Sequence, residues 1–547
     1  MKSFAATVLL ALAGCGSSGD DTSSSGGGNP GSSSTGTSSS TGTSSSTGTS
    51  SSTGTSSSTG TSSSVGTGGE GGAGTGTGGA TGTGGEGGAG TGTGGATGTG
   101  GEGGAGTGTG SATGTGGEGG AGTGGAGGGA GTGGEGGSAS SEPRIPWDWA
   151  GIVGTGQSLS VGTTPVMSTT QPFNNLKLSL GGARVPPWDP NNAALRMVDL
   201  VEPIRPLATG YPAPYPGNIY GETGHVPMAN QISFLVNEVA SRDYISVHTV
   251  VGESGQGMVA LKKGATDTGT TGRAYAATLF EVAAIARLAR AAGKTYGVGA
   301  IFLTHGETDS GSATYGAEVV QLWNDYNADL KALTGQTENI PLFISQQHGY
   351  PSGANQRAVS TLTQWRLGVE HPGDIVCTGP KYHLPGHGDG VHLSAVGYQQ
   401  MGEKYGQIYF EKIVMGRDWQ PLQPTRVERS GRVITVQLHV PVPPLRWDDR
   451  LPAPTAWANG RGFEVRQGNT KINISSVEIV GDSVKITCAS DLPASGVTVG
   501  YAMTTNSAPR PNGFPTWGQL RDSDPFVGST TGAAQPNYAV SFEMPVP

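Results

Sequence analysis

The chain has 547 residues, a formal net charge of −9 and only 13% charged residues. This acidic balance argues against nucleic acid as a partner, because binding to phosphates requires a basic surface. Most of the excess among the 100 glycines lies before residue 141, so the composition predicts that only the later part of the chain folds into domains.

Residues 1–15 have the features of an export signal. A short, weakly positive start precedes an apolar stretch over residues 4–12, which is too short to span a bilayer. The stretch ends in LAGC, which resembles a bacterial lipobox, in which the cysteine becomes the lipidated first residue. The polar tract after Cys15 favours this interpretation over an ordinary signal peptide with a chance cysteine. We therefore predict a secreted lipoprotein of a bacterial outer membrane or cell surface, attached to the membrane through Cys15.

Residues 16–142 consist largely of two successive repeats. The unit Ser-Ser-Ser-Thr-Gly-Thr recurs up to residue 64, and a sixteen-residue unit follows, marked by Glu70, Glu86, Glu102 and Glu118. Neither unit has enough apolar surface for stacking to offset the entropy cost of ordering. We expect a disordered Gly/Ser/Thr linker with a root-mean-square span of roughly 60 Å, which would hold later domains away from the membrane.

Residues 143–417 alternate strand-like and helix-like patterns. Runs rich in Val and Ile predict strands at 150–154, 244–251, 297–304, 341–345 and 374–377. Apolar residues at helical spacing predict helices at about 227–241, 273–292, 316–333 and 394–413. This alternation indicates an α/β fold, a three-layer α/β/α sandwich around a parallel sheet.

Residues 418–547 instead alternate apolar and polar side chains between prolines and glycines. This pattern predicts a C-terminal antiparallel β domain, either a small sandwich or an appended sheet. Such a domain either binds carbohydrate or serves for packing and spacing, and packing is the plainer explanation. Cys377 and Cys488 lack metal-ligand spacing and form either a disulfide or two buried free thiols.

Polar residues that could carry chemistry follow the predicted strands, and ligands of a parallel sheet bind at the carboxyl ends of its strands. Ser158 lies at a glycine turn after the first strand, where its hydroxyl group can be exposed. A glycine-rich loop with Gly255 follows the second strand, and His305-Gly306-Glu307 follows the most apolar strand. Each of these loops alone is also compatible with an ordinary turn.

A fourth loop places Asp389 three residues before His392. A carboxylate three residues before a histidine in the sequence can orient the imidazole ring while the ring faces a nucleophile on another loop. A surface carboxylate beside a capping histidine would give the same spacing.

Together the four loops resemble one family in their order and spacing, over about residues 147–415. The family is the SGNH (GDSL-like) hydrolases, in the branch that includes sialate O-acetylesterases and plant carbohydrate acetylesterases. The matching positions are Gly156-Gln157-Ser158, the turn around Gly255, His305-Gly306-Glu307 and Asp389-Gly390-Val391-His392.

The resemblance implies a serine ester hydrolase, most simply a carbohydrate O-acetylesterase that works through an acyl-serine intermediate. Ser158 would be the nucleophile, His392 the general base and Asp389 the residue that orients the base. The expected partner is an acetylated carbohydrate or another small ester, and the reaction requires no metal ion or cofactor.

The resemblance also implies secondary roles around this triad. Gly255 and His305 would contribute to the oxyanion hole, and Gln157 and Glu307 would support the site. His305 stands where the family has glutamine, so its ring would have to donate in place of an amide.

Two alternatives remain open. Ser254, in Gly-Glu-Ser-Gly, is a competing nucleophile, but the elbow motif that it resembles needs glycine two positions later, where Gln256 stands. A non-catalytic carbohydrate-binding surface adhesin on the same fold is the other alternative, although a binding protein has no reason to retain the complete triad.

Replacing Cys15 with alanine should remove the lipid and release the protein from the membrane, because residues 16–142 offer no second anchor. Cell fractionation and mass measurement of the mature N-terminus test this. Continued membrane attachment of the unlipidated variant would contradict the anchor assignment.

Overall fold

The structure is a computed structural model that describes residues 142–180, 189–204, 221–264, 273–348, 358–506 and 510–547, together with short strands between residues 58 and 115. Contacts divide the chain into two compact units, Met1–Gly136 and Gly137–Pro547. Cys15 and the export signal lie outside the described residues. No helix in the described ranges is both long and apolar enough to cross a membrane.

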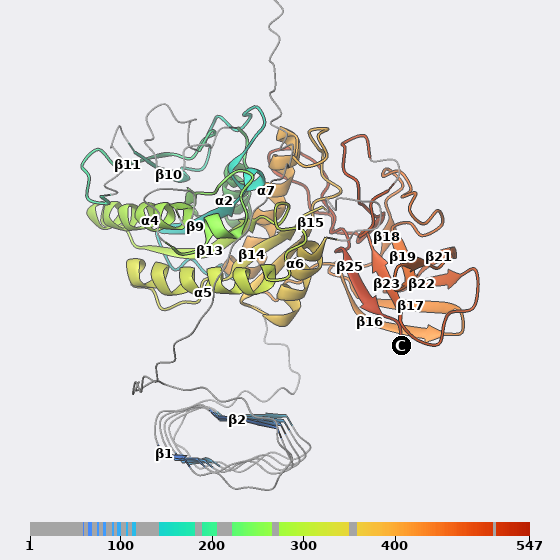
Figure 1. The fold of residues 1–547 in the computed structure, drawn as a ribbon. Helices are drawn as coiled ribbons and strands as arrows, with labels where there is room; N and C mark the ends of the chain where they lie inside the picture. The colour runs from blue at the N-terminus through green and yellow to red at the C-terminus, as the bar shows by residue number, and fades with distance from the viewer. Residues whose placement is uncertain are drawn as a thin grey trace, which may run out of the picture. The chain divides into compact units, whose positions relative to one another are not determined.

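In the first unit short parallel strands recur at intervals of sixteen residues, beginning in the last part of the six-residue repeat (Figure 1). One four-stranded sheet contains β1 (Ser58–Thr59), β3 (Gly74–Thr75), β5 (Gly90–Thr91) and β7 (Gly106–Thr107), and another contains β2 (Ser64–Thr67), β4 (Ala80–Thr83), β6 (Ala96–Thr99) and β8 (Ala112–Thr115). Paired residues are one repeat apart, as in Val65 and Thr81. This backbone pairing differs from the expected irregular linker. The side chains of these strands lie outside the described residues, so the linker assignment stays a prediction.

The second unit is built on a seven-stranded sheet with the order β11-β10-β12-β9-β13-β14-β15 (Figure 1). The strands are β9 (Trp149–Gly156), β10 (Leu176–Ser179), β11 (Arg196–Asp199), β12 (Ser246–Val250), β13 (Tyr296–Thr304), β14 (Leu342–Gln346) and β15 (Ile375–Pro380). All neighbouring strands are parallel except β10 and β11. The predicted α/β class with a mostly parallel sheet is confirmed, but β10 and β11, at one side of the sheet, were not predicted from the sequence.

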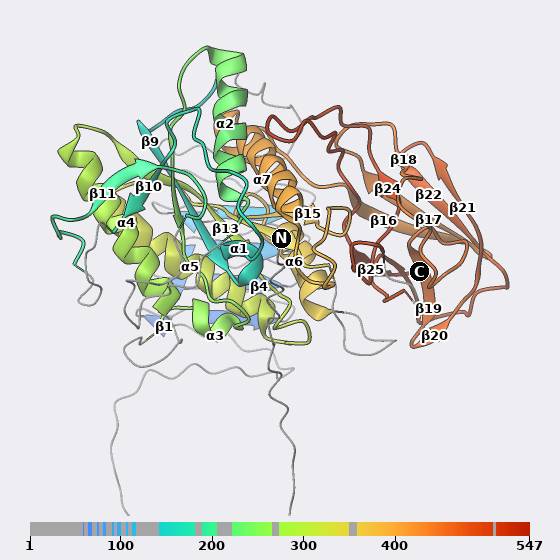
Figure 2. The ribbon, with the colours of Figure 1, turned by 90° about the horizontal axis from the view of Figure 1, so that it is seen from above.

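Helices cover both faces of this sheet because its strands alternate their side chains between two apolar clusters. Phe302 of β13 belongs to the cluster formed with α2 (His225–Ala240) and α7 (Ala395–Tyr409), which pack against each other (Figure 2). Ile301 belongs to the cluster formed with α4 (Arg273–Ala291) and α5 (Tyr315–Thr334). The remaining helical segments are α1 (Ser158–Val161), α3 (Met258–Leu261), α6 (Val359–Glu370) and a π-helical turn, η1 (Phe410–Val414).

The C-terminal part, here called the β domain, contains separate antiparallel sheets, as predicted. One sheet has β16 (Gln423–Ser430), β17 (Val433–His439), β22 (Ser483–Cys488) and β21 (Ile474–Val480). A second has β20 (Thr470–Lys471), β19 (Phe463–Gln467), β23 (Val497–Tyr501) and β25 (Phe542–Pro545), and β18 (Arg446–Trp447) pairs with β24 (Leu520–Arg521). Alternating side chains such as Ile434 and Val436 of β17 form its buried core.

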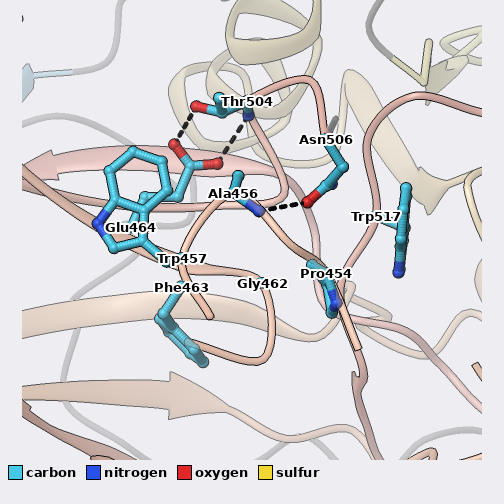
Figure 3. A pocket seen from close by; sticks show the side chains of 9 residues that line it. All are labelled: Pro454, Ala456, Trp457, Gly462, Phe463, Glu464, Thr504, Asn506 and Trp517. Carbon is cyan, nitrogen blue, oxygen red and sulfur yellow. Dashed lines mark hydrogen bonds between the residues drawn. The ribbon is translucent and has the colours of Figure 1, made fainter. Parts of the chain in front are cut away.

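A small pocket in the β domain is lined by aromatic and polar residues (Figure 3). The rings of Trp457 and Trp517 are only 4% and 2% exposed. The Glu464 carboxylate accepts hydrogen bonds from the amides of Met503 and Thr504, at 3.0 and 2.7 Å. Because the aromatic faces are covered and the carboxylate is satisfied internally, this pocket favours the packing role over carbohydrate binding.

The β domain shares a hydrophobic core with the α/β domain. Trp365 of α6 and Cys377 of β15 belong to the same buried cluster as Phe542 of β25, and the rings of Trp365 and Phe542 are 6.1 Å apart. Cys377 and Cys488 are both buried free thiols, the second of the two alternatives left open by the sequence.

A buried carboxylate also ties the two domains together. Glu403 of α7 is fully buried and accepts hydrogen bonds from the amides of Thr530 and Thr531 at 2.7 Å, and from Gln535. The carboxylate oxygens of Glu403, which belongs to the α/β domain, therefore accept several hydrogen bonds from the β domain. Without Glu403 these donors would be buried without an acceptor.

We expect Glu403→Ala to lower the free energy of unfolding by about 3 kcal/mol, because buried donors lose a charged acceptor. Urea unfolding followed by fluorescence measures this. Glu478→Ala, at an exposed position of β21, is the control and should leave the midpoint almost unchanged. Equal losses in the two variants would contradict the importance of this contact.

Candidate active site

The turn between β9 and α1 presents Ser158 at the carboxyl end of a central strand. Gly156 has a φ of +142°, and a Cβ built there would lie 2.1 Å from the carbonyl oxygen of Thr304, so only glycine fits. Ser158 is the first residue of α1, and the helix itself offers its amide no acceptor. Its hydroxyl group and its amide are thus both available at this edge of the sheet.

The structure brings the three predicted triad residues together. The Oγ of Ser158 lies 2.8 Å from Nε2 of His392, and Nδ1 of His392 lies 2.7 Å from Oδ2 of Asp389. The other oxygen of Asp389 accepts hydrogen bonds from the amides of Val391 and His392, at 2.9 and 2.8 Å. The short spacing of Asp389 and His392 therefore builds a turn that fixes the carboxylate and the ring at once.

The charge state of Asp389 fixes the tautomer of the histidine. Burial by itself would raise the pKa of the Asp389 carboxyl group, but hydrogen bonds from the ring and the amides of His392 and Val391 hold this pKa below its usual value. The ionised carboxylate accepts a hydrogen bond from the Nδ1–H group, so the lone pair of His392 lies on Nε2, which can accept a hydrogen bond from the Ser158 hydroxyl group.

The loop after β12 lies beside the serine turn and is anchored at both ends. The amide of Glu253 donates to the Gly156 carbonyl group at 2.9 Å, and its buried carboxylate forms an ion pair with Arg273. At the other end, the amide of Met258 donates to Asp309 at 2.7 Å. These contacts hold the predicted oxyanion residue Gly255, which has a φ of +70°, next to the turn that carries Ser158.

Ser254, the competing nucleophile, lies in the same loop. Within the described residues no hydrogen bond joins its hydroxyl group to a histidine. Among the described residues a histidine is therefore hydrogen-bonded to Ser158 and not to Ser254.

His305 does not fit the oxyanion role expected of it. It is fully buried, and its Nε2 donates to the carbonyl oxygen of Gln256 at 3.0 Å. Burial lowers the pKa of His305, so the ring is neutral and carries one N–H, which this bond uses. Its Nδ1 then carries only a lone pair and has no hydrogen-bond partner among the residues that the structure describes. His305 instead holds the loop of Gly255 in place.

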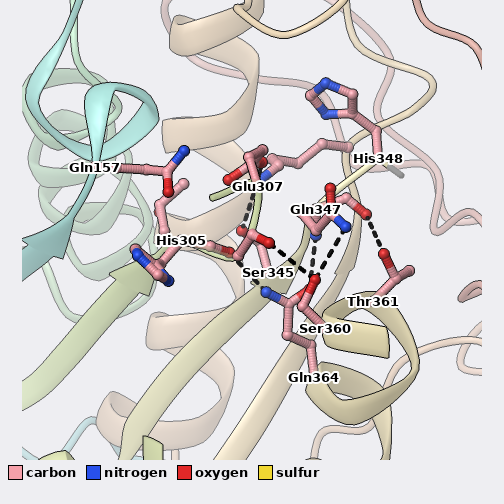
Figure 4. Close-up of polar contacts among 12 residues, drawn as sticks. Gln157, His305, Glu307, Ser345, Gln347, His348, Ser360, Thr361 and Gln364 are labelled. Carbon is pink, nitrogen blue, oxygen red and sulfur yellow. Dashed lines mark hydrogen bonds and ion pairs between the residues drawn. The ribbon is translucent and has the colours of Figure 1, made fainter. Parts of the chain in front are cut away.

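The predicted supporting residues Gln157 and Glu307 lie near each other at the carboxyl edge of the sheet (Figure 4). The side-chain Oε1 of Gln157 is 3.5 Å from the backbone amide nitrogen of Thr308, a long contact. Glu307 pairs with Lys381 at 3.4 Å, and both side chains are buried. Burial alone would raise the pKa of the Glu307 carboxyl group, but the Lys381 ammonium group lowers it. Sequence analysis did not identify Lys381, because nothing local marks it as a partner.

Helix α6 supports this edge with polar side chains (Figure 4). Gln364 donates to the carbonyl oxygen of His305 at 2.6 Å and accepts from the amide of Gln347 at 2.8 Å. Ser360 donates to the carbonyl oxygen of Gly306 at 2.9 Å. The buried residues of α6 thus include polar side chains as well as Trp365 and Leu367, which explains why hydrophobic spacing failed to reveal α6. Within the described ranges no group of three or more His, Cys, Asp and Glu side chains could hold a metal ion.

Comparison with known proteins gives no family by sequence. No protein-family model and no curated protein matches the chain. Among solved structures, it is similar to a carbohydrate acetylesterase from Xanthomonas citri, with 11% identity, a TM-score of 0.44 and coverage of 72% of this chain and 80% of that one. It is also similar to a protein of Arabidopsis thaliana, with 17% identity, a TM-score of 0.35 and coverage of 49% of this chain and 100% of that one. A third similar structure is NanS, with 15% identity, a TM-score of 0.26 and coverage of 38% of this chain and 68% of that one. These likenesses are too distant to assign a function.

The Glu307–Lys381 pair should be important for stability. Glu307→Gln leaves the Lys381 charge buried without a partner and should cost about 3–5 kcal/mol in free energy of unfolding, whereas Glu307→Leu with Lys381→Met should recover most of it. Urea titration measures all variants, and Glu428→Gln, in the exposed pair with Arg426, is the control. A single variant as stable as the control would show that the buried pair is not coupled.

Proposed function

We propose that this chain is a serine ester hydrolase of the SGNH type, acting on acetylated carbohydrate. The observation that carries the proposal is the hydrogen-bonded series Ser158–His392–Asp389, which joins residues 234 positions apart at the carboxyl end of β9. A structural hydroxyl group needs one acceptor, but it does not need a histidine whose other nitrogen is held by an ionised carboxylate. This combination is what activation of a nucleophile requires.

The reaction would begin with attack of the Ser158 Oγ on the ester carbonyl carbon. Nε2 of His392 takes the hydroxyl proton and later delivers it to the leaving alcohol. Asp389 keeps the ring in the required tautomer and stabilises the imidazolium ion. Water, activated by the same nitrogen, then releases the acid from the acyl-serine and restores the free hydroxyl group.

The developing oxyanion would be bound by backbone amides. The amide of Ser158 is free of the helix, and the amide of Gly255 is the second candidate because its loop is fixed against the Gly156 carbonyl group through Glu253. Each such donor is typically worth about 3–4 kcal/mol in the transition state. His305 acts on this hole indirectly, by holding the Gln256 carbonyl group.

Acetylated carbohydrate as the substrate rests on the sequence resemblance. The four loops resemble, in their order and spacing, the branch of SGNH hydrolases that contains carbohydrate acetylesterases, with departures at His305 and at the turn around Gly255. Together with the proposed lipid on Cys15, this would place the enzyme on the bacterial surface, where polymeric glycans are accessible.

Ser158→Ala should abolish ester hydrolysis, and Ser254→Ala, a matched change in the neighbouring loop, should leave it nearly intact. His392→Ala should be about as damaging as Ser158→Ala because the pair acts as a unit, and Asp389→Ala should cost less. The full-length protein is assayed on short-chain and long-chain aryl esters and on acetylated polysaccharide, and a fluorophosphonate should label Ser158, as read from peptide mass.

Two results would change the assignment. Labelling at Ser254, or full activity in Ser158→Ala, would contradict the SGNH proposal. Absence of both labelling and turnover on every ester, with retained binding to a glycan, would favour the surface adhesin.

A further inference from the structure

Asp389 and His392 lie in a tight loop, residues 385–394, just before α7. The amide of His387 donates to the carbonyl oxygen of His392 at 2.8 Å, and the amide of Ser394 donates to that of Pro385 at 3.0 Å. The side chains of Asp389 and His392 remain 40% and 25% exposed at its tip. A loop of this kind has little core of its own, so its position depends on what packs against it.

A segment of the β domain, Arg510–Phe514, is attached to the strand-end just before this loop. Arg510 donates through Nη1 to the carbonyl oxygen of Tyr382. Asn512 donates through Nδ2 to the carbonyl oxygen of Leu384 at 2.9 Å, and its Oδ1 accepts from the amide of Phe514 at 3.1 Å. The side chain of Asn512 therefore bridges the segment and the base of the loop.

The backbones approach so closely that only glycine fits at several positions. A Cβ built on Gly386 would lie 2.4 Å from the carbonyl oxygen of Asn512. A Cβ built on Gly513 would lie 2.7 Å from the amide nitrogen of Gly390 and 2.9 Å from the carbonyl oxygen of Gly388. The segment thus lies directly against the backbone on both sides of Asp389.

The buried side chain of Phe514 also holds this segment in place. Its side chain is fully buried in the cluster that contains Leu393, the residue after His392, and Tyr398 of α7. It also stacks on His348, with 4.0 Å between ring centroids. The stack on His348 therefore anchors the segment at a residue outside the loop that it touches.

We infer that Arg510–Phe514 is a positioning element of the triad, so that the β domain sets the place of His392 relative to Ser158. The inference rests on the proposed function for its catalytic meaning, but not for its geometry. The Ser158–His392 contact is 2.8 Å long, and displacement of a catalytic group by about 1 Å can cost on the order of 100-fold in rate.

Gly513→Ala tests the inference most directly, because the new methyl group must push against Gly388 and Gly390. Gly468→Ala is the matched control: Gly468 also has a positive φ, of +56° compared with +87°, but nothing lies within 4 Å of its added Cβ. Both variants should lose thermal stability because of the positive φ, and Gly513→Ala should lose more, because its Cβ also meets backbone atoms. Only Gly513→Ala should lose kcat, by about 10-fold to 100-fold, with KM little changed.

A second pair of variants, at two asparagines, keeps the inference testable if Gly513→Ala does not fold. Asn512→Ala removes a side-chain bond to the Leu384 carbonyl group, and Asn459→Ala removes a similar bond to Ile474 elsewhere in the β domain. Asn512→Ala should lower kcat several-fold, and Asn459→Ala should leave it unchanged at equal stability.

A readout independent of turnover separates this inference from the proposed function. In the full-length protein, the Nδ1 proton of His392 bound to Asp389 should give a strongly deshielded proton resonance, identified by its loss in His392→Gln. Gly513→Ala should shift or broaden it, and Gly468→Ala should not. If the wild type hydrolyses no ester but this pattern holds, the proposed function fails and the positioning role stands. Folded Gly513→Ala and Asn512→Ala with the resonance and kcat of their controls would overturn the positioning role.

Discussion

The hydrogen bond between Ser158 and His392 is the constraint on which the arrangement of the second unit depends. Its two residues come from the first and last parts of the α/β domain. A bond of 2.8 Å between such distant residues requires both of their supports to be rigid. Ser158 follows β9, a rigid support because this strand is hydrogen-bonded to β12 on one side and to β13 on the other. His392 has no strand of its own, and its position is set by α7 after it and by the β domain beside it.

Buried polar groups maintain the carboxyl edge of the sheet around this bond. Glu307 and Lys381 would each be costly to bury alone, and their pairing leaves a fixed pair of opposite charges near the triad. Gln364 and Ser360 saturate the carbonyl groups that follow β13. Hydrogen bonds such as those of Gln364 and Ser360 specify one geometry more sharply than an apolar cluster does, because every displacement breaks a hydrogen bond in a medium of low dielectric constant.

The parts of the fold that could be predicted from the sequence are those with a local signal. The Val-rich and Ile-rich central strands and the long amphipathic helices lie within a few residues of their predicted ranges. Strand β11, at the edge of the sheet, and β10 beside it are four residues each and only partly buried, so they carry no such pattern. Ser158 could be predicted as a candidate site residue because it follows a strand, and Asp389 and His392 because they stand three residues apart. Lys381 and the neighbours of Gly513 could not, because their partners are far away in the sequence. His305 was assigned by resemblance, and its bond to the Gln256 carbonyl group has no sequence signature.

The division of the chain at residue 417 illustrates the same limit. A change of periodicity marks where helices give way to strands, but it does not show whether two segments share a core. Here Trp365 and Cys377 of the α/β domain are buried together with Phe542, and Tyr382 donates a hydrogen bond to the carbonyl group of Ala539 at 2.8 Å. Removing the β domain would expose these side chains to water and leave buried polar groups without partners, so the α/β domain cannot keep its native surface alone. The β domain therefore completes the core of the α/β domain, and the loop of His392 lies along the surface where the two domains meet.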